Sequence, residues 1–85
     1  METKSEIGQI ADFLLQGRIG EANSAWNQVI GALSAEIRSR TPVEQQQFLP
    51  VLKKILEQQA QEDWVGMSDS LRYNILPLLN KAVSL

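Results

Sequence analysis

Apolar residues recur along the chain at spacings of three and four, and no segment alternates apolar with polar residues. This spacing is typical of amphipathic α-helices, whereas half-buried strands show a period of two. Four apolar stripes follow one another, separated by short polar or glycine-containing segments. We therefore predict a single all-α domain over residues 1–85, a four-helix up-and-down bundle made of two helical hairpins.

The first two stripes form the first expected hairpin. One stripe runs from Ile7 to Leu15, and Gly17 is expected to end that helix in a left-handed conformation. The other runs from Ala22 to Ile37, which is long enough for about five helical turns. We expect this second helix to stop near residues 38–40.

The junction between the two hairpins has the sharpest local signal. Thr41 can cap a helix, Pro42 suits the first helical position, and Glu44 can complete a capping box. A third helix is therefore expected to begin there. Pro50 lies within its apolar pattern and removes a backbone donor, so we expect a kink near Phe48 or a short first turn followed by a restart.

The fourth stripe begins after the acidic pair Glu62 and Asp63. Together with Asp69 these residues form a small acidic group that could suggest a cation site or acid–base chemistry. Carboxylates at a helix N-terminus stabilise the helix dipole without any ligand, so we interpret Asp63 as an N-cap. Pro77 is expected to bend the last third of this helix.

The apolar positions divide into an expected core and a remainder. The residues expected to point inward are Ile10, Leu14, Trp26, Ile30, Leu33, Phe48, Leu52, Ile55, Leu56, Leu71, Ile75 and Leu78. Four apolar residues are then left over, namely Phe13, Leu15, Val65 and Leu79. Monomeric proteins rarely expose large contiguous apolar patches, so this remainder favours a symmetric dimer or a bound partner helix.

Aromatic residues extend the candidate partner-binding surface. Trp26 and Trp64 both lie on apolar stripes, where core packing is the default. Trp64 is at a helix start, where a small bundle covers it least, so with Phe48 or Tyr73 it could rim a groove for a partner helix. The candidate partner-binding residues are Trp64, Phe13, Leu15, Val65, Tyr73 and Leu79. The nine glutamines are interpreted as a neutral, solvated helix face that would not repel a second copy.

Composition excludes most familiar catalytic chemistry. The chain of 85 residues has no cysteine and no histidine, so the common nucleophile systems, zinc sites and haem or iron–sulfur ligands lack obligatory members. Ser68 and Ser70 could nominally pair with Lys53 or Lys54, but no glycine-rich elbow accompanies them, and we interpret them as surface residues. We expect no enzyme activity, cofactor or metal.

Charge and hydropathy restrict partners and compartment. Eight basic residues are scattered among ten acidic ones, so we do not expect nucleic-acid binding. No apolar run approaches the roughly 20 residues that span a bilayer, and the first residues do not read as a signal peptide. We expect no membrane insertion. The absence of cysteine fits the cytoplasm.

The segment from Leu52 to Leu79 carries a family resemblance. Its acidic–aromatic turn ending in Trp64, followed by Leu71-Arg-Tyr73 and Pro77-Leu-Leu79, resembles the closing hairpin of small uncharacterised bacterial helical proteins. It is similar more loosely, in size and shape, to flagellar and type III export chaperones. Those small proteins usually have an acidic residue beside the tyrosine, where this chain has Arg72 and Asn74. The resemblance implies a helical hairpin and no catalytic residue.

These observations predict a non-enzymatic protein–protein interaction module, chaperone-like or adaptor-like, that binds a partner helix or its own copy. The alternative is a small regulatory or nucleoid-associated protein that binds nucleic acid. The two functions make different structural predictions, because nucleic-acid binding requires that folding bring the basic side chains onto one face. The residues concerned are Arg18, Arg38, Arg40, Lys53 and Lys54.

Overall fold

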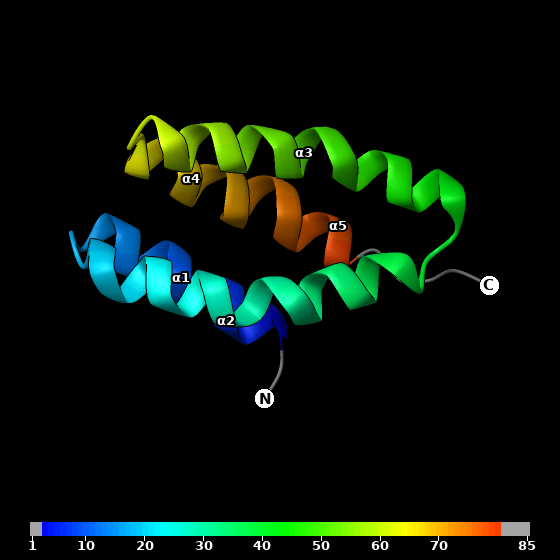
Figure 1. Ribbon diagram of the computed structural model, residues 1–85, viewed down its shortest axis with the longest axis horizontal. Coiled ribbons are helices and arrows are strands. Elements are labelled where there is room, and N and C mark those ends of the chain that lie inside the picture. The colour runs from blue at the N-terminus through cyan, green and yellow to red at the C-terminus, as the bar shows by residue number, and fades with distance from the viewer. Residues whose placement is uncertain (1–2, 81–85) are drawn as a thin grey trace.

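A computed structural model describes residues 3–80, which are helical apart from short connections and include no strand. The elements are α1 (Thr3–Leu15), α2 (Ile19–Arg38), α3 (Pro42–Ala60), α4 (Trp64–Ser70), the π-helical segment η1 (Leu71–Ile75) and α5 (Leu76–Asn80). The last three follow one another without a break and form one rod (Figure 1). The prediction of an all-α bundle made of two hairpins is confirmed.

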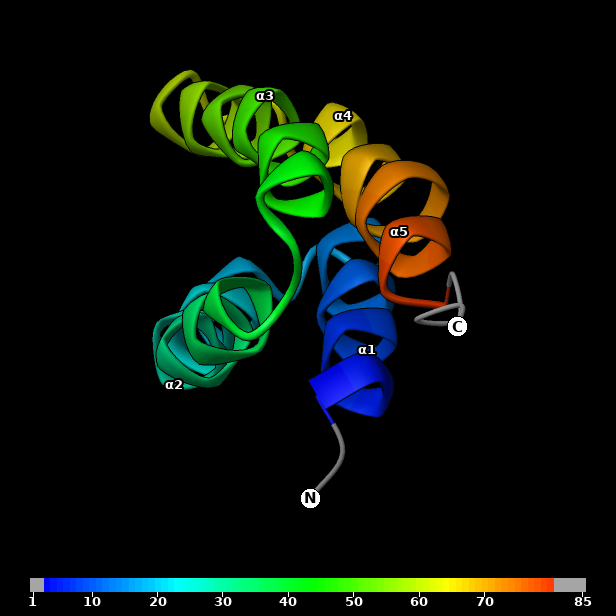
Figure 2. The ribbon, with the colours of Figure 1, turned by 90° about the vertical axis from the view of Figure 1, so that its right-hand side faces the viewer.

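The four rods form an open arc around a common centre when the molecule is viewed along its long axis. Figure 2 shows α2 beside α1, α1 beside the rod of α4, η1 and α5, and this rod beside α3. The helices at the two ends of the arc, α2 and α3, are consecutive in the chain yet contact each other only sparsely. One side of the bundle, between α2 and α3, is therefore the least closed.

Gly17 ends the first helix as predicted. It has a φ of 76°, and the N–H of Arg18 donates to the carbonyl oxygen of Phe13 at 2.9 Å. In the second hairpin Glu62 takes the same role with a φ of 57°, and the N–H of Asp63 donates to the carbonyl oxygen of Gln58 at 2.8 Å. A left-handed backbone is costly for a residue with a Cβ, so the second turn carries strain that the first avoids.

Replacing Glu62 with glycine is expected to raise the free energy of unfolding by about 0.5–1 kcal/mol, because glycine adopts a positive φ without steric cost. Chemical denaturation measures the difference. The matched control is Gln61→Gly, because Gln61 has an ordinary φ of −87° and glycine there is expected to destabilise the chain. Equal destabilisation by both glycines would contradict the strained turn.

The start of α3 is built as the sequence predicts. The hydroxyl of Thr41 accepts a hydrogen bond from the N–H of Glu44 at 3.2 Å, and the N–H of Thr41 donates to the Glu44 carboxylate at 3.1 Å. The hydrogen bond from the Thr41 N–H is the main reason why the pKa of the Glu44 carboxyl is lowered. The second reason is a hydrogen bond that the Thr41 hydroxyl donates to the same carboxylate. The stability that the ionised Glu44 carboxylate adds to the fold is therefore fully present above the ordinary pKa of a glutamate. It is lost as the pH falls through the lowered pKa of Glu44.

Thr41→Ala is expected to lower the free energy of unfolding by about 0.5–2 kcal/mol, because the N–H of Glu44 loses its acceptor at the junction of the hairpins. Thr41→Ser retains the hydroxyl and is expected to stay close to the native value. Urea denaturation at neutral pH distinguishes them, and an unchanged midpoint for the alanine variant would contradict the role of the cap.

The two internal prolines are accommodated in different ways. α3 continues through Pro50, so the expected restart is wrong. Pro50 is exposed, and the carbonyl left without a helical donor belongs to Gln46, which is exposed as well. Before Pro77 the rod widens into η1, where the N–H of Leu76 donates to the carbonyl of Leu71, five residues earlier. A π-helical segment thus lies just before Pro77, and the bend expected from this proline stays a prediction.

The buried core draws on every rod. Its apolar members are Ile7, Ile10, Ala11, Leu14, Ala22, Trp26, Val29, Leu33, Ile37, Phe48, Ile55, Met67, Leu71, Ile75 and Leu79. Two assignments made from the sequence are wrong. Leu56, expected inside, is 52% exposed, whereas Leu79, expected to be left over, is only 2% exposed.

The π-helical segment explains the error at Leu79. In a regular helix that buries Leu71 and Ile75, both Leu78 and Leu79 would lie near the buried face. The π-turn contains one extra residue, which rotates everything after it by about one position. Leu79 therefore enters the core, and Leu78 is only half-buried.

Candidate protein-binding surface

Four of the predicted partner-binding residues lie at one end of the bundle, where both hairpin turns are found (Figure 1). Phe13 and Leu15 end α1, and Trp64 and Val65 begin α4. Leu15 and Val65 are exposed, whereas Phe13 and Trp64 are half-buried and pack against the core. Most of the apolar area of the two aromatic rings at this end is therefore already used in packing.

The other two predicted residues do not join this patch. Tyr73 is exposed and lines a separate hollow of about 310 Å³ between α3 and the last rod. Leu79 is buried, so it cannot contribute to an exposed surface. The six residues therefore do not form one continuous face.

The polar groups singled out from the sequence have structural roles. Asp63 caps α4, since its carboxylate accepts from the N–H of Gly66 at 3.0 Å. Within residues 3–80 no group of three acidic residues is close enough to hold a metal ion. Ser68 and Ser70 are buried, so their interpretation as surface residues is wrong. The Ser68 hydroxyl donates to the carbonyl of Ala11 at 2.9 Å, and the Ser70 hydroxyl donates to the Gln58 side chain at 2.8 Å.

The basic residues are spread over the length of the bundle. Arg18 and Arg38 flank opposite ends of the 20-residue helix α2, and Lys53 and Lys54 lie in the middle of α3. The side chain of Arg40 is only 6% exposed. These five basic residues are therefore spread along the bundle, and one of them, Arg40, is largely buried.

Arg40 instead holds three helices together at the other end of the bundle. Its guanidinium donates to the carbonyl oxygens of Leu78 at 3.3 Å and Leu79 at 3.1 Å, near the end of α5. The same group lies 3.3 Å from the carboxylate of Glu36 in α2 and 3.7 Å from that of Glu44 in α3. In the sequence Arg40 is only one of the scattered charges, and no local signal indicates this role.

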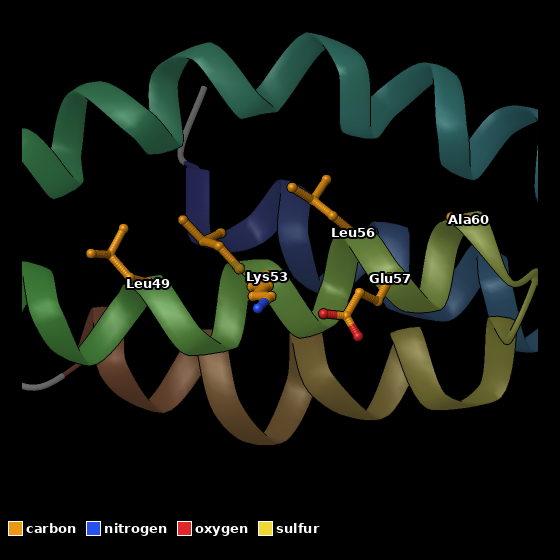
Figure 3. Close-up of a pocket in the computed structure, with 6 residues that line it drawn as sticks. Leu49, Lys53, Leu56, Glu57 and Ala60 are labelled. Atoms are coloured by element: carbon orange, nitrogen blue, oxygen red, sulfur yellow. The ribbon is translucent and has the colours of Figure 1, made fainter.

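An exposed apolar stripe runs along α3 on the less closed side of the bundle. Leu49 and Leu56 are 60% and 52% exposed, and Leu52 between them is half-buried. With Lys53, Glu57 and Ala60 they line a hollow of about 550 Å³ formed by α3 alone. Figure 3 shows Leu49 and Leu56 pointing from α3 toward the side where α2 runs. We call these six residues the α3 face.

Glutamines mark both ends of the α3 face. The side-chain amide of Gln45 donates to the carbonyl of Arg40 at 2.8 Å, and that of Gln59 donates to the Asn23 side chain in α2 at 3.0 Å. The prediction of a solvated glutamine face is therefore wrong for these two residues. Between these two hydrogen-bonded glutamines, α2 does not cover Leu49 and Leu56, and both leucines remain exposed.

The spacing of Leu49, Leu52 and Leu56 could have revealed this face from the sequence. Steps of three and four match the a and d positions of a heptad, the pattern by which one helix packs against another. A different set, with Phe48 and Ile55, holds α3 in the core. α3 thus carries two apolar stripes, of which the bundle buries one.

The fold and this surface define a small helical bundle with an exposed apolar stripe on α3. A family described as a domain of unknown function (DUF8042) matches residues 2–84, and the chain belongs to this family. Neither the search of curated proteins nor that of solved structures found a match. In residues 3–80 no helix has the length and apolar character needed to cross a membrane.

Proposed function

We propose that the chain is a non-enzymatic protein–protein interaction module whose α3 face binds one amphipathic helix. The observation that carries this proposal is the exposure of Leu49 and Leu56 beside a hollow of about 550 Å³. Burying such side chains on binding contributes roughly 25 cal/mol per Å² of apolar area. A partner helix is therefore a favourable occupant of this surface.

The shape of the α3 face fits a helix better than an extended peptide. Its leucines follow the heptad steps of helix-on-helix packing, and it extends from Leu49 to Ala60. At a rise of 1.5 Å per residue this corresponds to roughly 16 Å, or three helical turns. A bound strand would need a row of free backbone donors and acceptors, which a helix does not offer.

We further propose a cytoplasmic, adaptor-like or chaperone-like role for this module. The support is the absence of cysteine and the resemblance of Leu52 to Leu79 to the closing hairpin of small bacterial helical proteins. A small bundle that holds one helix of a client while leaving its other parts free would act in this way.

Site-specific photo-crosslinking in the cells that produce the chain tests the proposal. A photoreactive phenylalanine analogue at Leu56 is expected to trap a polypeptide. The matched control is the same analogue at Leu15, which is 53% exposed but lies at the end of α1, away from the α3 face. Loss of the adduct on changing Leu49 to glutamine is the second expected result, because Leu49 lies on the same face.

Adducts that form equally at both positions, or at neither, would contradict the proposed function. The mass of a specific adduct identifies the partner class. An adduct of twice the chain mass indicates a second copy, and any other mass indicates a different protein.

A further inference from the structure

We propose that the helix bound by the α3 face is α3 of a second copy of this chain, packed antiparallel across a twofold axis near residues 54 and 55. This inference rests on the proposed function, because it names the partner of the same surface. It is carried by the sizes and charges of the side chains on this face.

The six residues of the α3 face are arranged symmetrically along the helix. A twofold axis between positions 54 and 55 brings position 49 of one copy level with position 60 of the other, and it brings positions 52 and 53 within one residue of the levels of positions 56 and 57. Every residue of the face thus lies near the level of another residue of the same face. A symmetric dimer requires such self-complementarity, in which residue i meets j and j meets i.

The side chains at these positions are complementary in size. The large Leu49 is opposite the small Ala60, which leaves room for its side chain. Leu52 of one copy lies beside Leu56 of the other near the axis, so both copies of each leucine become buried. Alternation of large and small residues is what allows two helices to interdigitate.

The charges of the face are complementary as well. Lys53 and Glu57 line the hollow, and within residues 3–80 neither forms an ion pair. Antiparallel packing brings Lys53 of each copy next to Glu57 of the other, which gives two equivalent ion pairs. Antiparallel helix dipoles also attract, and a net charge of −2 per chain causes little repulsion.

The expected dimer is reversible. A contact built on one helix from each copy lies at the small end of specific interfaces, so we expect a dissociation constant on the order of micromolar. The native chain should therefore change from monomer to dimer within the concentration range of analytical ultracentrifugation.

Charge reversal tests the pairing directly. Lys53→Glu and Glu57→Lys each place like charges opposite each other, and each is expected to weaken dimerisation by about tenfold or more. The double variant recreates two opposite-charge pairs and is expected to return close to the native dissociation constant. Lys54→Glu is the matched control, since it makes the same change one residue away, off the face. It is expected to leave the dissociation constant within about threefold of native.

Sedimentation of these four variants and the native chain decides the question. A native chain that remains monomeric up to millimolar concentration overturns the inference. The inference is also overturned if the double variant dimerises as weakly as the single variants, or if Lys54→Glu dimerises as weakly as Lys53→Glu. If the chain is monomeric but Leu56 is crosslinked to a different protein, the proposed function stands and the second copy is excluded. If Leu56 gives no specific adduct either, both fail.

Discussion

Replacing Phe48 with alanine is expected to lower the free energy of unfolding by about 3–5 kcal/mol, the usual cost of deleting a large buried aromatic side chain. Phe48 is 1% exposed, and only Phe48 and Ile55 are fully buried in the 19-residue helix α3. The ring also lies beneath the guanidinium of Arg40, whose central carbon is 5.4 Å from the ring centroid. The substitution therefore removes both an anchor of α3 and a contact of Arg40.

Urea denaturation followed by tryptophan fluorescence measures this loss. Phe48→Leu retains most of the apolar volume and is expected to cost much less, about 1–2 kcal/mol. Val43→Ala, at a position that is 67% exposed on the same helix, is expected to leave the midpoint nearly unchanged. A Phe48→Ala variant as stable as Val43→Ala would show that α3 is not anchored by this ring.

Replacing Arg40 with alanine is expected to lower the free energy of unfolding by about 2–4 kcal/mol, because part-buried polar groups of three helices lose their partner at once. The carbonyls of Leu78 and Leu79 lose a charged donor, and the carboxylates of Glu36 and Glu44 lose a cation. The end of α5 should loosen first. Hydrogen exchange of the amides in α5 is therefore expected to accelerate more than that of α1.

Arg18→Ala is the matched control for Arg40. Arg18 forms an ion pair with Glu21 and lies over the Phe13 ring, but its side chain is 48% exposed. Exposed ion pairs of this kind contribute little. If both variants have the same midpoint, or if α5 is no less protected without Arg40, the guanidinium does not hold the helices together.

Local signals in the sequence were sufficient for most of the fold. Gly17 ends α1, Thr41 with Glu44 starts α3, and Asp63 caps α4, each as predicted. These features depend on residues within one turn of each other, so their chemistry can be read without knowledge of the tertiary structure. The number and order of the rods follow from them.

Features set by contacts between distant segments could not be predicted in this way. Arg40 meets α5 across 38 and 39 positions of sequence, and Ser68 meets Ala11 across 57. The burial of Leu79 depends on the extra residue in η1, which shifts the face of the last rod. Tertiary packing determines which of these residues are buried and which partners they meet, and the local apolar periodicity does not show that packing.

For the candidate surface as well, some features could be predicted from local sequence and others depend on tertiary packing. The excess of apolar residues in the sequence predicts an exposed remainder, and Leu15, Val65 and Tyr73 are exposed at scattered places. The prediction that Leu56 lies in the core is wrong because α3 has two apolar stripes, and the spacing alone does not say which one the bundle buries. The open arrangement of α2 and α3 leaves the stripe with Leu49 and Leu56 outside.

The rate at which a single cysteine on the α3 face is alkylated tests the central claim most directly. The chain has no cysteine of its own, so Ala60→Cys on the face and Ala35→Cys on the exposed side of α2 each report one position. If the α3 face binds a helix, Ala60→Cys reacts several-fold more slowly in intact cells than in the dilute purified chain, and Ala35→Cys reacts equally in both. Equal rates for Ala60→Cys under the two conditions would contradict a bound helix on this face.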